Sequence, residues 1–152
     1  MSTYQSTLIG RTEVAEGTMA FQCEKPKDFV FKAGQYIDLS LSGFQPGQSN
    51  GLTHIFSIAS SPYDEELLVT TRMRNTVFKQ ALSILPIGTE VRIEGPMGSF
   101  SVHQNTARPA VFLAAGLGSR HSSACSRMQL GRSFATRFFY FTRTAISRMP
   151  RS

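Results

Sequence analysis

Residues 54–62 read His-Ile-Phe-Ser-Ile-Ala-Ser-Ser-Pro, and residues 95–100 read Gly-Pro-Met-Gly-Ser-Phe. The first stretch predicts a strand over residues 54–60, rich in the apolar and hydroxyl residues that suit a sheet. The turn formers of residues 61–64 separate it from a second predicted strand over residues 67–72. These stretches decide the fold because they set its pattern of short strands joined by turns. The remaining segments add strands of similar length.

Further short strands are predicted on both sides. Residues 3–40 alternate and turn in the manner of antiparallel strands, most clearly over residues 18–23 and 35–41. Residues 89–94 alternate as well, whereas the polar, Gly- and Pro-rich residues 42–51 predict a loop. About six short strands at fairly regular spacing favour a mainly β fold, either a small antiparallel barrel or a sandwich.

One helix is predicted between the strands, over residues 77–85. Asn75 is the expected N-cap, and Pro86 is expected to stop the helix. The start of such a helix attracts phosphate through its free N–H groups and its dipole. A helix that simply plugs the open end of the barrel remains the alternative. The apolar stripe predicted for this helix consists of Val77, Phe78, Ala81, Leu82 and Leu85.

Four segments in order resemble the FAD-binding half of the ferredoxin-NADP reductase superfamily. They are residues 33–36 (Ala-Gly-Gln-Tyr), 54–62, 71–74 (Thr-Arg-Met-Arg) and 95–100, and the resemblance covers roughly residues 3–118. It implies a six-stranded antiparallel Greek-key flavin-binding barrel with one capping helix, and FAD as the cofactor.

The resemblance also implies roles for individual residues. Phe56 would stack on the isoalloxazine ring, and Ser57 would hydrogen-bond near its reactive N5 edge, which makes Ser57 the candidate catalytic residue. His54 stands where the family usually has arginine, and would face the pyrophosphate. Taken singly, Phe56 also fits a core aromatic, Ser57 a sheet-edge hydroxyl and His54 a structural histidine. The candidate cofactor-binding residues are His54, Ile55, Phe56, Ser57, Thr71, Arg72, Arg74, Asn75 and Thr76.

Histidine at position 54 changes the expected phosphate contact. Arginine carries a permanent charge that can bind phosphate in a bidentate manner, whereas histidine, with an ordinary pKa of about 6.5, is only partly charged at neutral pH. We therefore expect a weaker contact that depends on pH.

The charge distribution divides the chain. Residues 1–118 contain nine Lys and Arg against ten acids, whereas residues 119–152 contain seven Arg and no acid. We expect three parts: an FAD-binding barrel over residues 1–106, a remnant of a nucleotide-binding domain over residues 107–118, and an irregular or disordered basic tail over residues 119–152. A shifted reading frame is one explanation of the tail, and a real basic tail for an anionic partner is the other.

The predicted remnant ends in a Gly-x-Gly turn at Gly116 and Gly118. It is similar to a nucleotide phosphate loop, but the helix signature that should follow is missing. In a complete relative, NAD(P)H would pass a hydride to the flavin, and electrons would leave to a haem, iron–sulfur or flavodoxin-like acceptor. We expect this chain to be truncated and not competent alone. A non-enzymatic barrel, either a binding module or an inactive fragment with a basic tail, is the rival interpretation.

Several other classes are not favoured by the sequence. Its net positive charge belongs wholly to residues 119–152, which argues against a nucleic-acid-binding face. There is no long apolar run and no apolar leader, so we expect no membrane span and a cytoplasmic location. Cys23 and Cys125 are too few and too far apart for a disulfide framework or zinc site, and Cys23 is expected to be a packed thiol.

Overall fold

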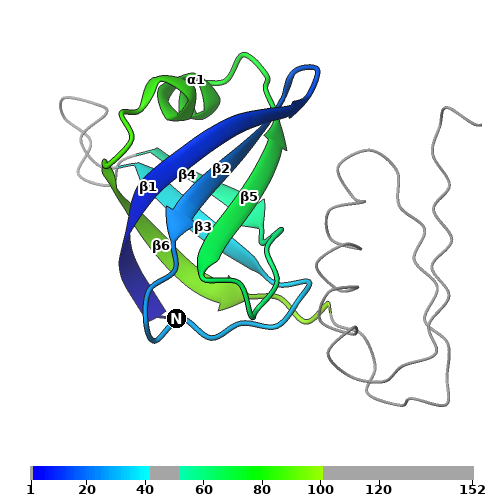
Figure 1. The fold of residues 1–152 in the computed structure, drawn as a ribbon, viewed down its shortest axis with the longest axis vertical. Coiled ribbons are helices and arrows are strands. Elements are labelled where there is room, and N and C mark those ends of the chain that lie inside the picture. Colours follow the sequence, from blue (N-terminus) through cyan, green and yellow to red (C-terminus); the bar gives the residue numbers. More distant parts are fainter. Residues whose placement is uncertain (1, 42–51, 101–152) are drawn as a thin grey trace, which may run out of the picture.

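The computed structural model describes residues 2–41 and 52–100 (Figure 1). The predicted loop over residues 42–51, the nucleotide-domain remnant with Gly116 and Gly118, and the tail over residues 119–152 lie outside the described residues. The elements are β1 (Ser2–Ala15), β2 (Thr18–Glu24), β3 (Tyr36–Leu41), β4 (Leu52–Ser57), β5 (Glu66–Arg72), α1 (Val77–Ile84) and β6 (Glu90–Met97).

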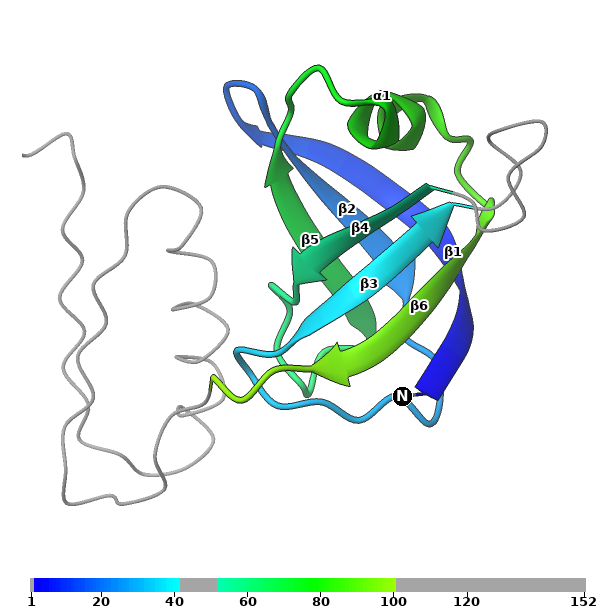
Figure 2. The same ribbon diagram turned by 180° about the vertical axis from the view of Figure 1, so that it is seen from behind.

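The strands form one six-stranded antiparallel sheet in the order β4-β3-β6-β1-β2-β5. An isolated bridge between Ile58 and Val69 joins the segments after β4 and within β5, so the sheet curls round into a barrel. β3, β4 and β5 are neighbours in chain order, and β6 returns beside β3, which is the Greek-key arrangement. Figures 1 and 2 show α1 lying across one end of this barrel. The prediction of a Greek-key barrel with one capping helix is confirmed.

The barrel is filled by the inward-facing residues of every strand. At the start of β3 the burial alternates, because Ile37 and Leu39 are at most 1% exposed while Asp38 between them is half-buried. Cys23 on β2 lies in the same core, as expected of a packed thiol. Burial raises its pKa to about 12, so this thiol stays protonated and unreactive at neutral pH.

Two features at the start of the capping helix differ from the prediction. Thr76, not Asn75, is the N-cap: its backbone is extended and its hydroxyl accepts the Lys79 N–H at 3.4 Å. Both residues are good capping types, so composition could not separate them. Val77 was expected on the apolar stripe but is 58% exposed, whereas Phe78, Ala81 and Leu82 of that stripe are buried.

The far end of α1 is tied to β1. Arg11 donates hydrogen bonds to the carbonyl oxygens of Ser83 and Leu85, at 2.5 and 3.0 Å. These are C-terminal carbonyls that a helix leaves without partners, and a cation there also complements the helix dipole. Pro86 follows and ends the helix, as predicted.

Candidate functional site

His54 lies on β4 at the end of the barrel that α1 covers. Its ring packs edge-on against Phe56, with 4.9 Å between the ring centroids, and at 5.3 Å against Phe78 of α1. Phe56 and Phe78 also contact each other, at 5.7 Å. The imidazole is thus held by two aromatic rings while the residue itself remains exposed to solvent.

The predicted residues on β4 divide between its two faces. His54 and Phe56 pair with Leu39 and Ile37 and share the core-facing side, whereas Ile55 lies on the opposite side and is 60% exposed. Phe56 is only 4% exposed, so its ring belongs to the core in this structure. Ser57 is half-buried on the same face as Ile55, opposite Tyr36 of β3.

The other predicted residues follow β5 into the start of α1. Thr71 is buried, and its hydroxyl bonds to the Arg72 carbonyl at 3.3 Å. Arg72 and Arg74 are exposed. Asn75 is also exposed, and its side-chain oxygen accepts a hydrogen bond from the Gln80 amide. The structure therefore gathers Arg72, Arg74 and the Thr76 cap at the end of β5, and it turns Thr71 inward.

Lys79 is a residue of this region that the sequence interpretation missed. It is 9% exposed, and its Nζ donates a 2.8 Å hydrogen bond to the Arg72 carbonyl oxygen. Burial and the nearby Arg74 lower the pKa of Lys79. Burial and the charge of Lys79 lower the pKa of His54. A lysine in the first turn, where a cation opposes the helix dipole, was the signal that could have revealed it.

We call the basic residues His54, Arg72, Arg74 and Lys79 the cationic cluster; Arg72 joins it through its backbone carbonyl oxygen, and His54, whose pKa is lowered, gains its charge at acidic pH. None of these side chains forms an ion pair with a carboxylate of residues 2–41 or 52–100, where the ion pair found is Arg92–Glu94 on β6. The helix start adds further positive potential, because its first N–H groups lack partners within the helix. Among the described residues the basic side chains at this end therefore form no ion pair, and the nearest acidic residues by position, Glu13 and Glu16, lie on the β1–β2 hairpin that bonds to Met73 through the Gly17 carbonyl oxygen.

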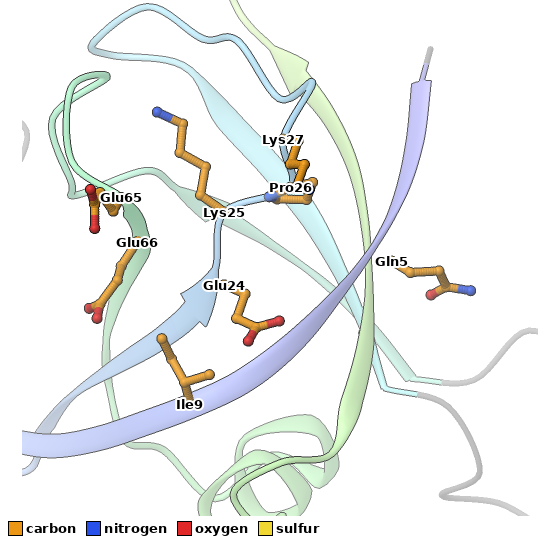
Figure 3. A pocket seen from close by; sticks show the side chains of 8 residues that line it. All are labelled: Gln5, Ile9, Glu24, Lys25, Pro26, Lys27, Glu65 and Glu66. Atoms are coloured by element: carbon orange, nitrogen blue, oxygen red, sulfur yellow. The ribbon is translucent and has the colours of Figure 1, made fainter.

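A shallow pocket of about 430 Å³ lies at the opposite end of β5 (Figure 3). Its walls include Glu24, Glu65 and Glu66 together with Lys25. Lys25 turns away toward the 61–64 turn, where its Nζ bonds to the carbonyl oxygens of Pro62 and Asp64 at 2.6 and 3.1 Å. The pocket contains none of the predicted site residues.

Neither a metal site nor a membrane helix is found in the part of the chain that the structure describes. No group of three or more His, Cys, Asp and Glu residues there is placed to hold a metal ion. No helix there has the length and apolar character needed to cross a membrane.

Sequence comparison connects this geometry to known reductases, although no family model matches the chain. The reductase component of propane 2-monooxygenase from Mycolicibacterium goodii is 30% identical over 126 residues, covering 80% of this chain and 34% of that protein. Ferredoxin–NADP reductase B of Sorangium cellulosum is 30% identical over 102 residues, covering 66% of this chain and 40% of that protein. The chain belongs to the ferredoxin-NADP reductase superfamily.

Solved structures of the superfamily share the fold. The ferredoxin NADP+ reductase of Neisseria gonorrhoeae, solved with bound FAD and NADP, superposes with a TM-score of 0.72 at 12% identity, covering 91% of this chain and 56% of that one. At such identity the likeness establishes the fold alone. The chain spans about a third of the length of its first curated relatives, so their complete activity does not transfer to it directly.

Proposed function

We propose that this chain provides the FAD-binding domain of an NAD(P)H-dependent oxidoreductase. The observation that carries the proposal is the cationic cluster at the start of α1. Basic side chains that pair with no carboxylate of the described residues fit a dianionic diphosphate, and the helix start adds N–H donors and a favourable dipole. FMN has one terminal phosphate and would therefore contact fewer of these groups.

The free edge of β4 explains how one ligand would reach residues on both faces of that strand. Within residues 2–41 and 52–100, β4 pairs with β3 alone over Leu52–Ser57, and its link toward β5 comes later, at Ile58. A ligand lying along this edge would meet His54 from one face and Ser57 from the other. We propose that His54, Arg72, Arg74 and Thr76 bind the diphosphate, and that Ser57 hydrogen-bonds to the flavin edge.

The remaining predicted residues receive supporting roles in the proposal. Phe56 would offer little surface to a flavin, because it is 4% exposed, and its main task would be to hold His54 in place. Ile55, at 60% exposed, offers apolar surface on the side of Ser57. Asn75 would steady the helix start through Gln80, and Thr71 would support β5 from within the core.

Bound flavin would supply the redox chemistry, taking an electron pair from NAD(P)H and releasing electrons singly to a haem, iron–sulfur or flavodoxin-like acceptor. The part of this chain would be to bind and orient the cofactor. Its Ser57 hydroxyl, which both donates and accepts, would hold the proton-bearing edge of the ring in a fixed hydrogen bond.

Flavin titration of the full 152-residue chain tests the proposal. FAD should bind more tightly than FMN, and riboflavin should bind weakest, because the cationic cluster acts on the diphosphate. Quenching of flavin fluorescence on binding provides the affinities. Equal affinity for FAD and FMN, or no binding of either, would contradict the assignment and favour a barrel without a flavin.

A further inference from the structure

Lys79 has binding capacity that the described residues do not use. An ammonium carries three N–H donors, and among residues 2–41 and 52–100 the Lys79 amine makes one hydrogen bond, to the Arg72 carbonyl. The residue is 9% exposed, so only a small part of it is open to solvent or to a ligand. A ligand at the start of α1 would find the remaining donors close to the helix N-cap, three residues away at Thr76.

Lys79 also forms no ion pair with a carboxylate of the residues that the structure describes. Arg74 lies near enough to lower its pKa, and Lys79 in turn lowers the pKa of His54. Lys79 is thus electrostatically coupled both to the end of β5 and to β4. A nearly buried cation that lacks a carboxylate and has cationic neighbours is unfavourable by itself. An anion placed between the two strands would relieve this repulsion.

We propose that Lys79 is a binding residue for the diphosphate bridge of the flavin dinucleotide, and that it determines the preference for a diphosphate over a monophosphate. The inference rests on the proposed function and adds a specificity-determining residue to it. Two linked phosphates can face Arg74 and His54 together with Lys79 between them, whereas a single phosphate leaves part of the cluster uncompensated.

A purely structural role for Lys79 is the alternative, since its amine also ties α1 to β5. Lys25 is a matched control, because its Nζ likewise donates to backbone carbonyl oxygens, those of Pro62 and Asp64, at the other end of β5. A structural lysine should lower the affinity for every flavin by a similar factor. A lysine that contacts the diphosphate should change the ratio of the FAD and FMN affinities.

The experiment measures dissociation constants of FAD, FMN and riboflavin for the full chain and for Lys79→Met, Lys79→Arg and Lys25→Met. We expect Lys79→Met to reduce the FAD-to-FMN affinity ratio by about tenfold, the lower end of the effect of a hydrogen bond to a charged group. Its affinity for riboflavin, which has no phosphate, should not change. Lys79→Arg preserves the charge, so its FAD-to-FMN affinity ratio should remain close to that of the unaltered chain. Lys25→Met should leave this ratio unchanged.

The outcomes separate the inference from the proposed function. If the unaltered chain does not prefer FAD, the proposed function fails and the inference fails with it. If the unaltered chain prefers FAD and Lys79→Met has the same FAD-to-FMN affinity ratio, only the inference about Lys79 is overturned. Circular dichroism checks that each variant is folded. Should Lys79→Met unfold, Lys79→Gln replaces it, because its neutral amide keeps a donor while removing the charge, and the same fall in the ratio is expected.

Discussion

Two lysines at opposite ends of β5 make similar hydrogen bonds in different electrostatic surroundings. Lys25 donates to two carbonyl oxygens, lies 5.5 Å from the centre of the Phe31 ring, and shares its pocket with Glu24, Glu65 and Glu66. Lys79 donates to one carbonyl oxygen and has cationic neighbours. The comparison teaches that a lysine among acidic neighbours can serve the fold alone, whereas the basic neighbours of Lys79 mark the α1 end as the place where an anionic ligand would be stabilised.

The two ends are separate enough to be tested independently. β5 runs from Glu66 beside the pocket to Arg72 beside α1, and six residue steps along a strand span about 20 Å. This exceeds the screening length of about 8 Å at physiological ionic strength. A substitution at the pocket end should therefore leave ligand binding at the α1 end nearly unchanged.

The largest expected effect comes from removing an aromatic ring at each end. Phe78→Ala and Phe31→Ala each delete a ring that is at most 7% exposed, and each should lower the free energy of unfolding by about 3–5 kcal/mol. Only Phe78→Ala should also weaken FAD binding, because Phe78 supports the His54 ring. Urea unfolding and flavin titration measure the two effects. Equal loss of FAD affinity in both variants would show that the ends are not independent.

A smaller effect is expected from reversing one exposed charge at each end. Arg74→Glu should weaken FAD binding by about tenfold, because it places a negative charge beside the diphosphate. Lys27→Glu changes the net charge equally at the pocket end and should have almost no effect. Titrations at low and high salt provide the check, since the Arg74→Glu effect should shrink as salt rises. An effect of the same size for both variants would mean that net charge, not the cluster, governs binding.

Much of the fold could be predicted because its local signals agree with its tertiary structure. The alternation of residues 35–41 predicted β3, and the turn formers of residues 61–64 predicted a turn that the structure closes with a hydrogen bond from the Asp64 N–H to the Ser61 carbonyl. The strand predicted over residues 54–60 is shorter in the structure, where β4 ends at Ser57. Beyond Ser57 the chain leaves β3 and bridges to β5 through Ile58. Such a change of partner strand depends on the tertiary structure and leaves no local pattern in the sequence.

The candidate site was less predictable, because it depends on which side chains the barrel brings together. The family resemblance predicted His54, Arg72 and Arg74 as site residues. In the structure they lie on β4, at the end of β5 and just before α1. The role of Lys79 depends on a side chain that bends back to the end of β5. The helical pattern specified only its position on α1 and could not specify that contact.

The smallest expected effect concerns pH at His54. In the flavin-free chain, burial and Lys79 lower the pKa of His54. The unfolded chain therefore takes up a proton at this histidine at a higher pH than the folded chain does, so the free energy of unfolding should fall as pH decreases through about 6.5. His54→Gln should reduce that loss in acid, whereas His103→Gln, which alters a histidine outside the described residues, serves as the matched control. Urea unfolding at pH 7.5 and 5.5 measures the difference.

The same histidine should give the opposite pH dependence once a diphosphate is bound. A dianion beside the imidazole favours its charged form, so in the FAD complex the pKa of His54 should rise. FAD affinity should then increase as pH falls from 8 to 6, over the range in which the stability of the flavin-free chain begins to decline. His54→Gln should flatten both curves, because both depend on one proton. If the variant flattens the stability curve and leaves the affinity curve unchanged, His54 does not contact the diphosphate, and its place in the cationic cluster is structural.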